Sequence, residues 1–176
     1  LPVPEFARSL KEQIAQDLHR DIHRGLTSQD VIDTAFVLSL THILPIFAER
    51  LGKLQSAMAQ LDKDHGAAPL MGRTRMQAAL PITVSDRLSS WSLPVTDHLT
   101  RLHEMSPRLL RLQCGGPVGI SSGDNLAAHL GLVAPAKSWH AMRDGFGELA
   151  GWLSLVSGSL GKIGMDISLM AQQGFD

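Results

Sequence analysis

One apolar stripe of helical spacing constrains this chain more than any other feature. Between residues 30 and 64, large apolar side chains recur at intervals of three or four, which places them on one face of an α-helix. The stripe predicts a helix far longer than the average of about 11 to 12 residues, and such helices are expected to pack lengthwise in a bundle. Its members are Phe36, Leu40, Ile43, Phe47, Leu51, Leu54, Met58 and Leu61.

Pro45 interrupts this stripe. Proline in a helix interior removes a backbone hydrogen bond and clashes with the preceding turn. We therefore expect a kink near residues 41–44 rather than two separate helices. After the helix, Gly66, Pro69 and Gly72 predict a loop.

Two further stripes follow, and the last has the alternating spacing of a heptad seam. Pro94 and Pro107 predict irregularities in the first of them, and the glycine-rich segment 114–124 predicts a turn-rich connection. Sustained strand alternation is absent from the sequence, so we expect an all-α, long-helix bundle over residues 1–176. The stripes comprise Trp91, Val95, Leu99, Leu102, Met105 and Leu109, then Leu149, Leu153, Val156, Leu160, Ile163, Ile167 and Met170.

The length of these helices raises a question of burial. A helix of some 35 residues is about 50 Å long, and a body of three such helices has much surface for its volume. We expect other subunits to cover part of the apolar surface. A self-contained bundle with leucine and methionine on its surface is the alternative.

Charge and cysteine content exclude several classes of protein. Sixteen Lys and Arg balance seventeen Asp and Glu, so no basic excess favours nucleic acid or an anionic membrane. Cys114 is the single cysteine, and no run of about 18 uncharged apolar residues predicts a membrane span. No secretion signal is visible at the start, which is Leu1 rather than Met. A cytoplasmic protein without nucleic-acid or membrane partners fits best.

The first candidate site precedes the longest helix, in residues 23–30 (HRGLTSQD). Thr27 or Ser28 suits the N-cap, and Asp30 would lie in the first turn, where the helix dipole favours negative charge. Capping alone explains these residues. The functional interpretation is that hydroxyls and free N–H groups at a helix start bind a carboxylate.

The second candidate is residues 72–81 (GRTRMQAALP), expected as a loop between long helices. Thr74, Arg75 and Gln77 suit an anionic, oxygen-rich ligand because guanidinium groups pair with carboxylates at two points. A solvated basic turn is the alternative.

Other chemistries have weaker signals. The glycine-rich segment after Gln113 lacks the strand and spacing of a dinucleotide site, and Gly161-Lys162 lacks the upstream glycine of a phosphate loop. His19 and His23 are four apart, but no glutamate completes a zinc protease motif. Cys114 has no nearby histidine in sequence, so a buried structural thiol is favoured over a nucleophile.

Three blocks together resemble the fumarase/aspartase/adenylosuccinate lyase superfamily in order and spacing. They are His23–Thr34 (HRGLTSQDVIDT), Gly72–Thr83 (GRTRMQAALPIT) and Trp139–Gln172, with LGKIGMDI at its centre. The branch that lactonises 3-carboxy-cis,cis-muconate to 4-carboxymuconolactone, in protocatechuate (β-ketoadipate pathway) breakdown, is the most similar. The resemblance implies a central fragment that lacks the family's N-terminal segment, its C-terminal domain and its Ser-Ser-x-Met-Pro-x-Lys-x-Asn-Pro loop.

The resemblance also implies roles for the candidate residues. Thr27 and Ser28 would bind one substrate carboxylate, while Thr74 and Gln77 would supply further donors. The catalytic pair would be His23, which could protonate or orient a neighbour, and Arg75. Lys162 is a block residue that we expect to be structural.

Arg75 stands where relatives that release fumarate usually have histidine, which argues against adenylosuccinate cleavage. The missing loop supplies the catalytic serine in relatives, so we expect the fragment alone to be inactive. No metal or redox cofactor is implied, and three subunits of a homotetramer would meet at each active site. The alternatives are another superfamily lyase, such as one acting on succinyl adducts, or a non-catalytic helical oligomerisation module.

Overall fold

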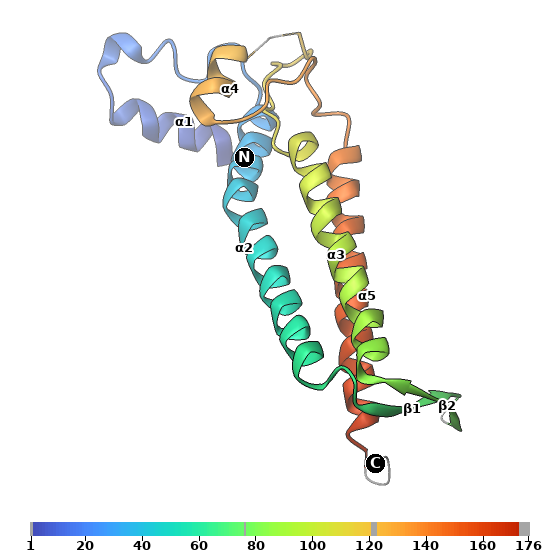
Figure 1. The fold of residues 1–176 in the computed structure, drawn as a ribbon. Helices are drawn as coiled ribbons and strands as arrows, with labels where there is room; N and C mark the ends of the chain where they lie inside the picture. The colour runs from blue at the N-terminus through green and yellow to red at the C-terminus, as the bar shows by residue number, and fades with distance from the viewer. Residues whose placement is uncertain (1, 76, 121–122, 173–176) are drawn as a thin grey trace. The chain divides into compact units, whose positions relative to one another are not determined.

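The computed structural model describes residues 2–75, 77–120 and 123–172 (Figure 1). Helices dominate these ranges, which confirms the all-α class. The elements are α1 (Pro2–Glu12), the 3-10 turn η1 (Gln16–Leu18), α2 (Ser28–His65), β1 (Pro69–Thr74), β2 (Gln77–Thr83), α3 (Val84–Leu109), α4 (Asp124–Leu130) and α5 (Asp144–Met170).

The chain forms two compact units. Unit 1 comprises Leu1–Leu44 and Met105–Gly147, and unit 2 comprises Pro45–Glu104 and Glu148–Asp176. Helix α2 continues through Pro45, as expected, and the boundary between the units falls at this proline. The kink itself stays a prediction.

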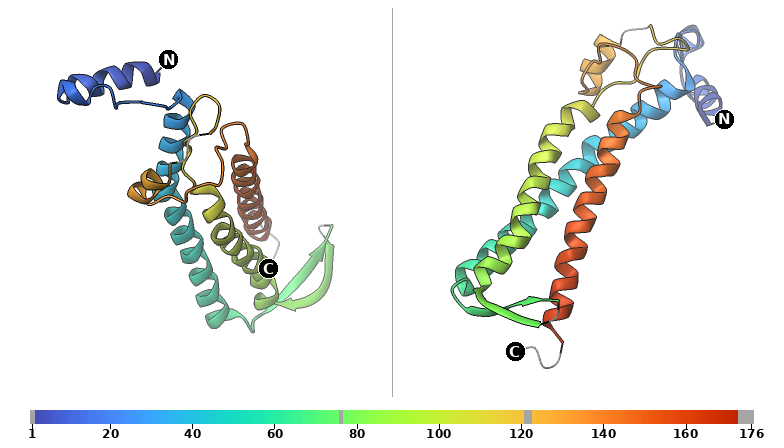
Figure 2. Two further views of the ribbon diagram at one scale, coloured as in Figure 1. Left: turned by 90° about the horizontal axis from the view of Figure 1, so that it is seen from above. Right: turned by 90° about the vertical axis from the view of Figure 1, so that its right-hand side faces the viewer.

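Unit 2 is built from three helical segments that run side by side (Figures 1 and 2). Phe47 of α2 packs edge-to-face on Trp152 of α5, with ring centroids 5.5 Å apart. The indole N–H of Trp152 donates to the carbonyl of His98 on α3 at 2.9 Å. Apolar positions of the three predicted stripes contribute to this core, since Leu51, Met58, Trp91, Val95, Leu102, Leu149 and Val156 are buried. Trp152, which was in none of the stripes, is buried with them.

The expectation of a loop without strands between α2 and α3 was wrong. β1 and β2 form an antiparallel hairpin in which Pro69 pairs with Thr83 and Thr74 with Gln77. The register shifts between Met71 and Arg73, at Gly72, where a Cβ would lie 2.5 Å from the carbonyl oxygen of Leu80. Most of the hairpin is exposed, so its sequence lacks the alternation that a strand with one buried face would have.

Unit 1 contains a second core, which includes the first residue of the glycine-rich segment. Its buried members come from α2, from α4 and from the chain on either side of α4: Val37, Leu112, Cys114, Ala127 and Leu132. The short helices α1 and α4 were not predicted. Helix α4 ends at Gly131, whose φ of 65° suits the left-handed C-terminal position of a helix.

Helix α2 is long and apolar enough to cross a membrane, with a mean hydropathy of 1.8 over its best window. A mostly buried core helix of a soluble protein meets the same criterion, but only 22% of this window is buried. Polar side chains of α2 bind other residues of this chain. Thr34 exchanges hydrogen bonds with the backbone of Gln113, and Asp33 pairs with Arg143. Both contacts lie within unit 1, and the absence of a membrane partner stays a prediction.

Candidate functional site

The start of α2 has only part of the predicted cap, because the capping bond is made by Asp30 and not by a hydroxyl of Thr27 or Ser28. The helix begins at Ser28, with Asp30 in its first turn. Thr27 is therefore the N-cap residue, and its backbone N–H donates to Asp30 Oδ2 at 2.9 Å, which is one half of a capping box. Within the described residues, the hydroxyls of Thr27 and Ser28 take part in no hydrogen bond. Two half-buried hydroxyls are thus available to a ligand at a positive helix end.

Asp30 makes more contacts than a cap requires. Its side chain is 2% exposed, and Oδ1 accepts from Gln113 Nε2 at 2.9 Å and from the N–H of Gly115 at 3.2 Å. Oδ2 accepts from the N–H of Gly116 at 2.9 Å in addition to Thr27. Four N–H donors therefore surround this carboxylate.

Gln113 is the second buried polar residue of this cluster, with 1% exposure. Its Nε2 also donates to Ser138 Oγ at 2.7 Å, and its Oε1 accepts from the backbone N–H of Trp139 at 2.8 Å. Sequence reasoning treated Asp30 only as a helix-start residue and assigned Gln113 no role. The available signal was a glutamine directly before a glycine-rich segment.

Asp33, one turn further along α2, has a separate set of partners. It accepts from Gln29 Nε2 and from Arg143 NH1, both at 2.8 Å. The Arg143 guanidinium also lies over the rings of Trp139 and Phe146, 5.9 and 5.2 Å from their centroids. This ion pair fastens the start of α5 to α2 within unit 1.

His23 lies in the turn before α2, in the same unit as Thr27 and Ser28. Its φ of 61° is in the left-handed region, which few non-glycine residues adopt. Its Nε2 is buried and has no hydrogen-bond partner among the described residues. A strained histidine with an unpaired ring nitrogen is consistent with a functional role.

The other three predicted site residues lie on the hairpin of unit 2. Thr74 ends β1, Gln77 begins β2, and Arg75 is in the turn between them with a φ of 46°. All three are exposed. The structure thus groups the six candidates into two sets, one in each unit.

Lys162 has the structural partners that we expected. Its ammonium group donates to Asp166 and to Ser90, and Asp166 also accepts from the indole N–H of Trp91 at 2.7 Å. Burial alone would raise the pKa of Asp166, but the bonds from Lys162 and Trp91 and the charge of Arg87 lower it. This cluster joins α5 to α3.

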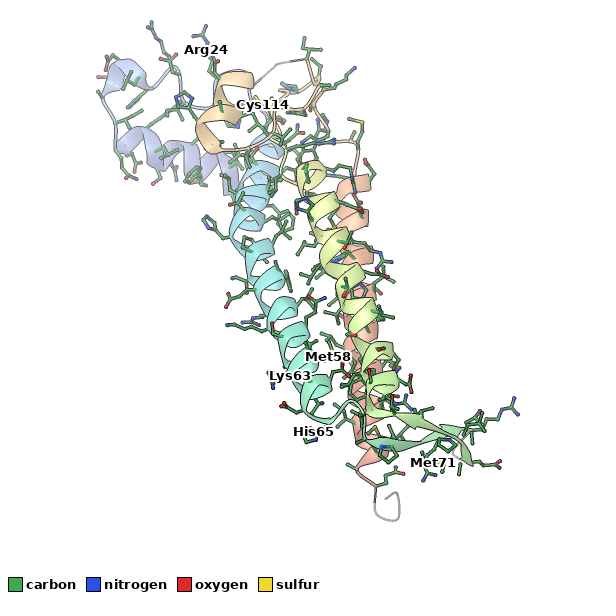
Figure 3. All side chains as sticks on the ribbon, viewed as in Figure 1. Arg24, Met58, Lys63, His65, Met71 and Cys114 are labelled. Carbon is green, nitrogen blue, oxygen red and sulfur yellow. The ribbon has the colours of Figure 1, made fainter. Side chains whose placement is uncertain are left out.

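Cys114 is buried and forms no disulfide among the described residues, as expected for a structural thiol. Burial and the charge of Asp30 raise its pKa, which disfavours the reactive thiolate. Figure 3 places Cys114 and Arg24 in unit 1 and Met71 on the hairpin. Among the described residues, no three His, Cys, Asp or Glu side chains converge as metal ligands.

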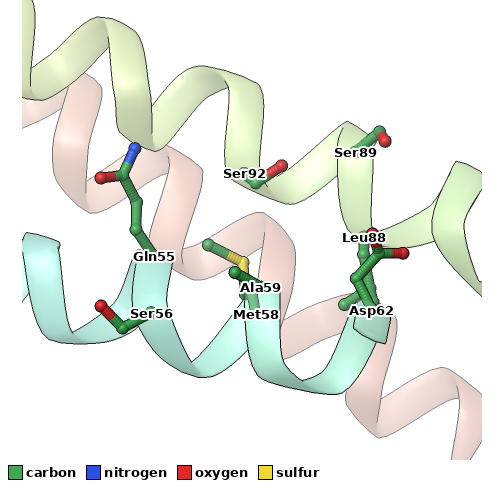
Figure 4. Close-up of a pocket in the computed structure, with 8 residues that line it drawn as sticks. All are labelled: Gln55, Ser56, Met58, Ala59, Asp62, Leu88, Ser89 and Ser92. Atoms are coloured by element: carbon green, nitrogen blue, oxygen red, sulfur yellow. The ribbon is translucent and has the colours of Figure 1, made fainter. Parts of the chain in front are cut away.

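A pocket of about 430 Å³ lies between α2 and α3 in unit 2 (Figure 4). It contains none of the predicted site residues, and Asp62 is its one charged lining residue. A carboxylate there repels an anionic ligand. The lining consists of Gln55, Ser56, Met58, Ala59, Asp62, Leu88, Ser89 and Ser92.

Comparison with known proteins assigns the family. The profile of the family described as "Lyase" matches residues 3–176. The 3-carboxy-cis,cis-muconate cycloisomerase of Pseudomonas aeruginosa is 39% identical over 95% of this chain and 39% of its own length. The crystal structure of a fumarate lyase from Mesorhizobium sp. BNC1 has a TM-score of 0.92 at 34% identity, covering 99% of this chain and 43% of that one.

A relative with a different name is nearly as similar. The N-acetyl-S-(2-succino)cysteine lyase of Dickeya dadantii is 36% identical over 83% of this chain and 34% of its own length. This chain belongs to the lyase family of the fumarase/aspartase superfamily. It spans about two fifths of the length of the relatives that it matches.

Proposed function

We propose that this chain is the central part of an enzyme that closes 3-carboxy-cis,cis-muconate to 4-carboxymuconolactone. The observation that carries the proposal is the 39% identity to a cycloisomerase of that substrate, over nearly the whole chain. The free hydroxyls of Thr27 and Ser28 at the helix start support it, because the substrate is a polycarboxylate.

In this proposal, a carboxylate oxygen of the substrate adds to a carbon–carbon double bond, which closes the lactone ring. The electron pair of that bond shifts to the carbon beside a second carboxylate, and a proton is then delivered there. Thr27 and Ser28 hold one carboxylate, while Thr74, Arg75 and Gln77 stabilise the charge that develops on the other. His23, with its unpaired Nε2, supplies the proton or orients the neighbouring group that supplies it.

A second candidate is elimination from a succinyl adduct, because a lyase of N-acetyl-S-(2-succino)cysteine is 36% identical. Both reactions stabilise negative charge on the carbon beside a carboxylate. Arg75 favours lactonisation, because arginine remains charged and cannot exchange a proton with a leaving group as histidine does. The enzyme would act as a cytoplasmic homotetramer with shared sites.

Turnover of three substrates tests the proposal. The complete enzyme, at the length of its relatives, is incubated with 3-carboxy-cis,cis-muconate, N-acetyl-S-(2-succino)cysteine and adenylosuccinate, and products are identified by NMR. We expect lactone formation with kcat/KM at least a hundredfold above that for either adduct. Preferred release of fumarate from an adduct would replace the cycloisomerase proposal with the lyase alternative.

A further inference from the structure

The contacts of Asp30 exceed those of a helix cap. A capping box needs only the bond to the Thr27 N–H. The remaining three bonds reach Gln113, Gly115 and Gly116, which are more than eighty residues away in sequence. These three bonds hold the glycine-rich segment against the start of α2.

We propose that Asp30 is a positioning residue of the carboxylate site. Its carboxylate holds the Thr27–Ser28 turn and the Gly115–Gly116 backbone as one rigid body, so that the two hydroxyls are fixed before substrate binds. This inference rests on the proposed function. Asp30 itself does not bind substrate, because both its oxygens already accept two N–H bonds each.

The charge of Asp30 is suited to this role. No Lys or Arg side chain bonds to it among the described residues, and four N–H dipoles together with the start of α2 stabilise the buried anion. Oδ2 of Asp30 links the Thr27–Ser28 turn directly to the Gly115–Gly116 backbone, because it accepts from the N–H groups of Thr27 and Gly116. Any rotation of this carboxylate therefore displaces the turn and the glycine-rich segment together.

Contacts with neighbouring residues restrict the position of the glycine-rich segment. Thr34 Oγ1 donates to the carbonyl of Gln113 and accepts from its N–H, and the Gln113 side chain binds Ser138 and Trp139. A Cβ at Gly115 would lie 2.3 Å from Cβ of Ser138. Since neighbouring chain surrounds the segment, loss of the Asp30 bonds cannot be compensated by a small shift.

The test is Asp30→Asn, which keeps the size of the side chain. In either orientation of the amide, its NH2 group faces two of the four N–H donors. We expect kcat/KM of the complete enzyme to fall at least tenfold, and the amides of Gly115 and Gly116 to exchange at least tenfold faster in the folded protein. The matched control is Asp33→Asn, a buried carboxylate of the same helix that has no bond to the segment. It should leave both amides protected.

A double-mutant cycle with Ser28→Ala separates positioning from general stability. If Asp30 acts through the Thr27–Ser28 turn, kcat/KM of the double variant is no more than about twofold lower than kcat/KM of the worse single variant. Independent, multiplicative losses, or wild-type kcat/KM for folded Asp30→Asn, would overturn the inference. If Asp30→Asn does not fold, Gln113→Met replaces it in the cycle, since it removes one bond to Asp30 together with the bonds to Ser138 and Trp139.

The proposed function and this inference fail in different ways. If the wild-type enzyme turns over none of the three substrates tested above, the proposed function is wrong. Amide exchange in the folded complete enzyme still tests the rigid body, because it requires no turnover, and unchanged protection of Gly115 and Gly116 in Asp30→Asn would disprove it.

Discussion

At the residue scale, we propose that the hydroxyls of Thr27 and Ser28 bind a carboxylate of the substrate. We expect Ser28→Ala and Thr27→Ala to lower kcat/KM of the complete enzyme at least tenfold, because each removes a donor to a carboxylate. Stability should fall by less than the ~0.5–2 kcal/mol of a lost helix cap, because neither hydroxyl bonds to the backbone of α2 and the bond from the Thr27 N–H to Asp30 remains. Ser39→Ala, which removes an exposed hydroxyl of the same helix, is the control. Wild-type kinetics in both variants, measured beside urea unfolding, would place the carboxylate elsewhere.

Arg75 combines an exposed charge with a left-handed backbone. Arg75→Gly should stabilise the hairpin turn by up to about 1 kcal/mol, because glycine adopts positive φ without strain. The same change should lower kcat/KM strongly, since it removes the guanidinium. Arg75→Lys should retain partial activity, because a point charge cannot pair with a carboxylate at two points, and Arg75→His should not confer adenylosuccinate cleavage.

Steady-state kinetics and thermal unfolding measure both effects, with exposed Arg50 of α2 changed to Ala as the control. Unchanged kcat/KM for Arg75→Gly would leave the residue as a solvated turn position.

At the residue scale, the sequence predicts only contacts between residues that are close together in the chain. The cap at Thr27 and the place of Asp30 in the first turn follow from residues within one helical turn of each other. The bonds from Asp30 to the glycine-rich segment could not be predicted, because they join residues brought together only by the fold.

At the scale of elements, His98 links α3 to α5. Its side chain is buried, and Nε2 lies 2.8 Å from Ser159 Oγ. Burial lowers the pKa of His98, and the charge of Arg101 lowers it further against the smaller effect of Asp97. The unfolded chain therefore takes up a proton near pH 6.5 that the folded chain does not, and stability falls as the pH drops below 6.5.

We expect His98→Gln to flatten the loss of unfolding free energy between pH 8 and pH 5, because glutamine can still bond to Ser159 and does not titrate. Urea unfolding at several pH values measures this, with exposed His65→Gln as the control. An unchanged pH dependence in His98→Gln would assign the acid sensitivity to other groups.

Element prediction succeeded where the periodicity was strong. The three stripes became α2, α3 and α5, since a buried helical face repeats every three or four residues over many turns. The hairpin could not be predicted because most of its side chains are exposed, and α1 and α4 are too short for a clear period.

At the scale of the whole molecule, much of α5 leaves its apolar side chains uncovered by this chain. Leu155, Met165 and Ile167 are 52%, 61% and 52% exposed. Burial of such side chains is worth about 25 cal/mol per Å², which favours association of subunits. We expect a homotetramer by light scattering at micromolar concentration, and Leu155→Glu with Ile167→Glu should shift it towards smaller species. A monomer that binds no dye for exposed hydrophobic surface would contradict this prediction.

The central proposal is that the start of α2 binds a carboxylate of a polycarboxylate substrate. A crystal structure of the complete enzyme with a tricarboxylate analogue of 3-carboxymuconate tests it most directly. The account predicts one ligand carboxylate within hydrogen-bond distance of Thr27 and Ser28, and a second paired with Arg75 or Gln77, from the same or another subunit. A ligand whose carboxylates contact neither Thr27 nor Ser28 would contradict it.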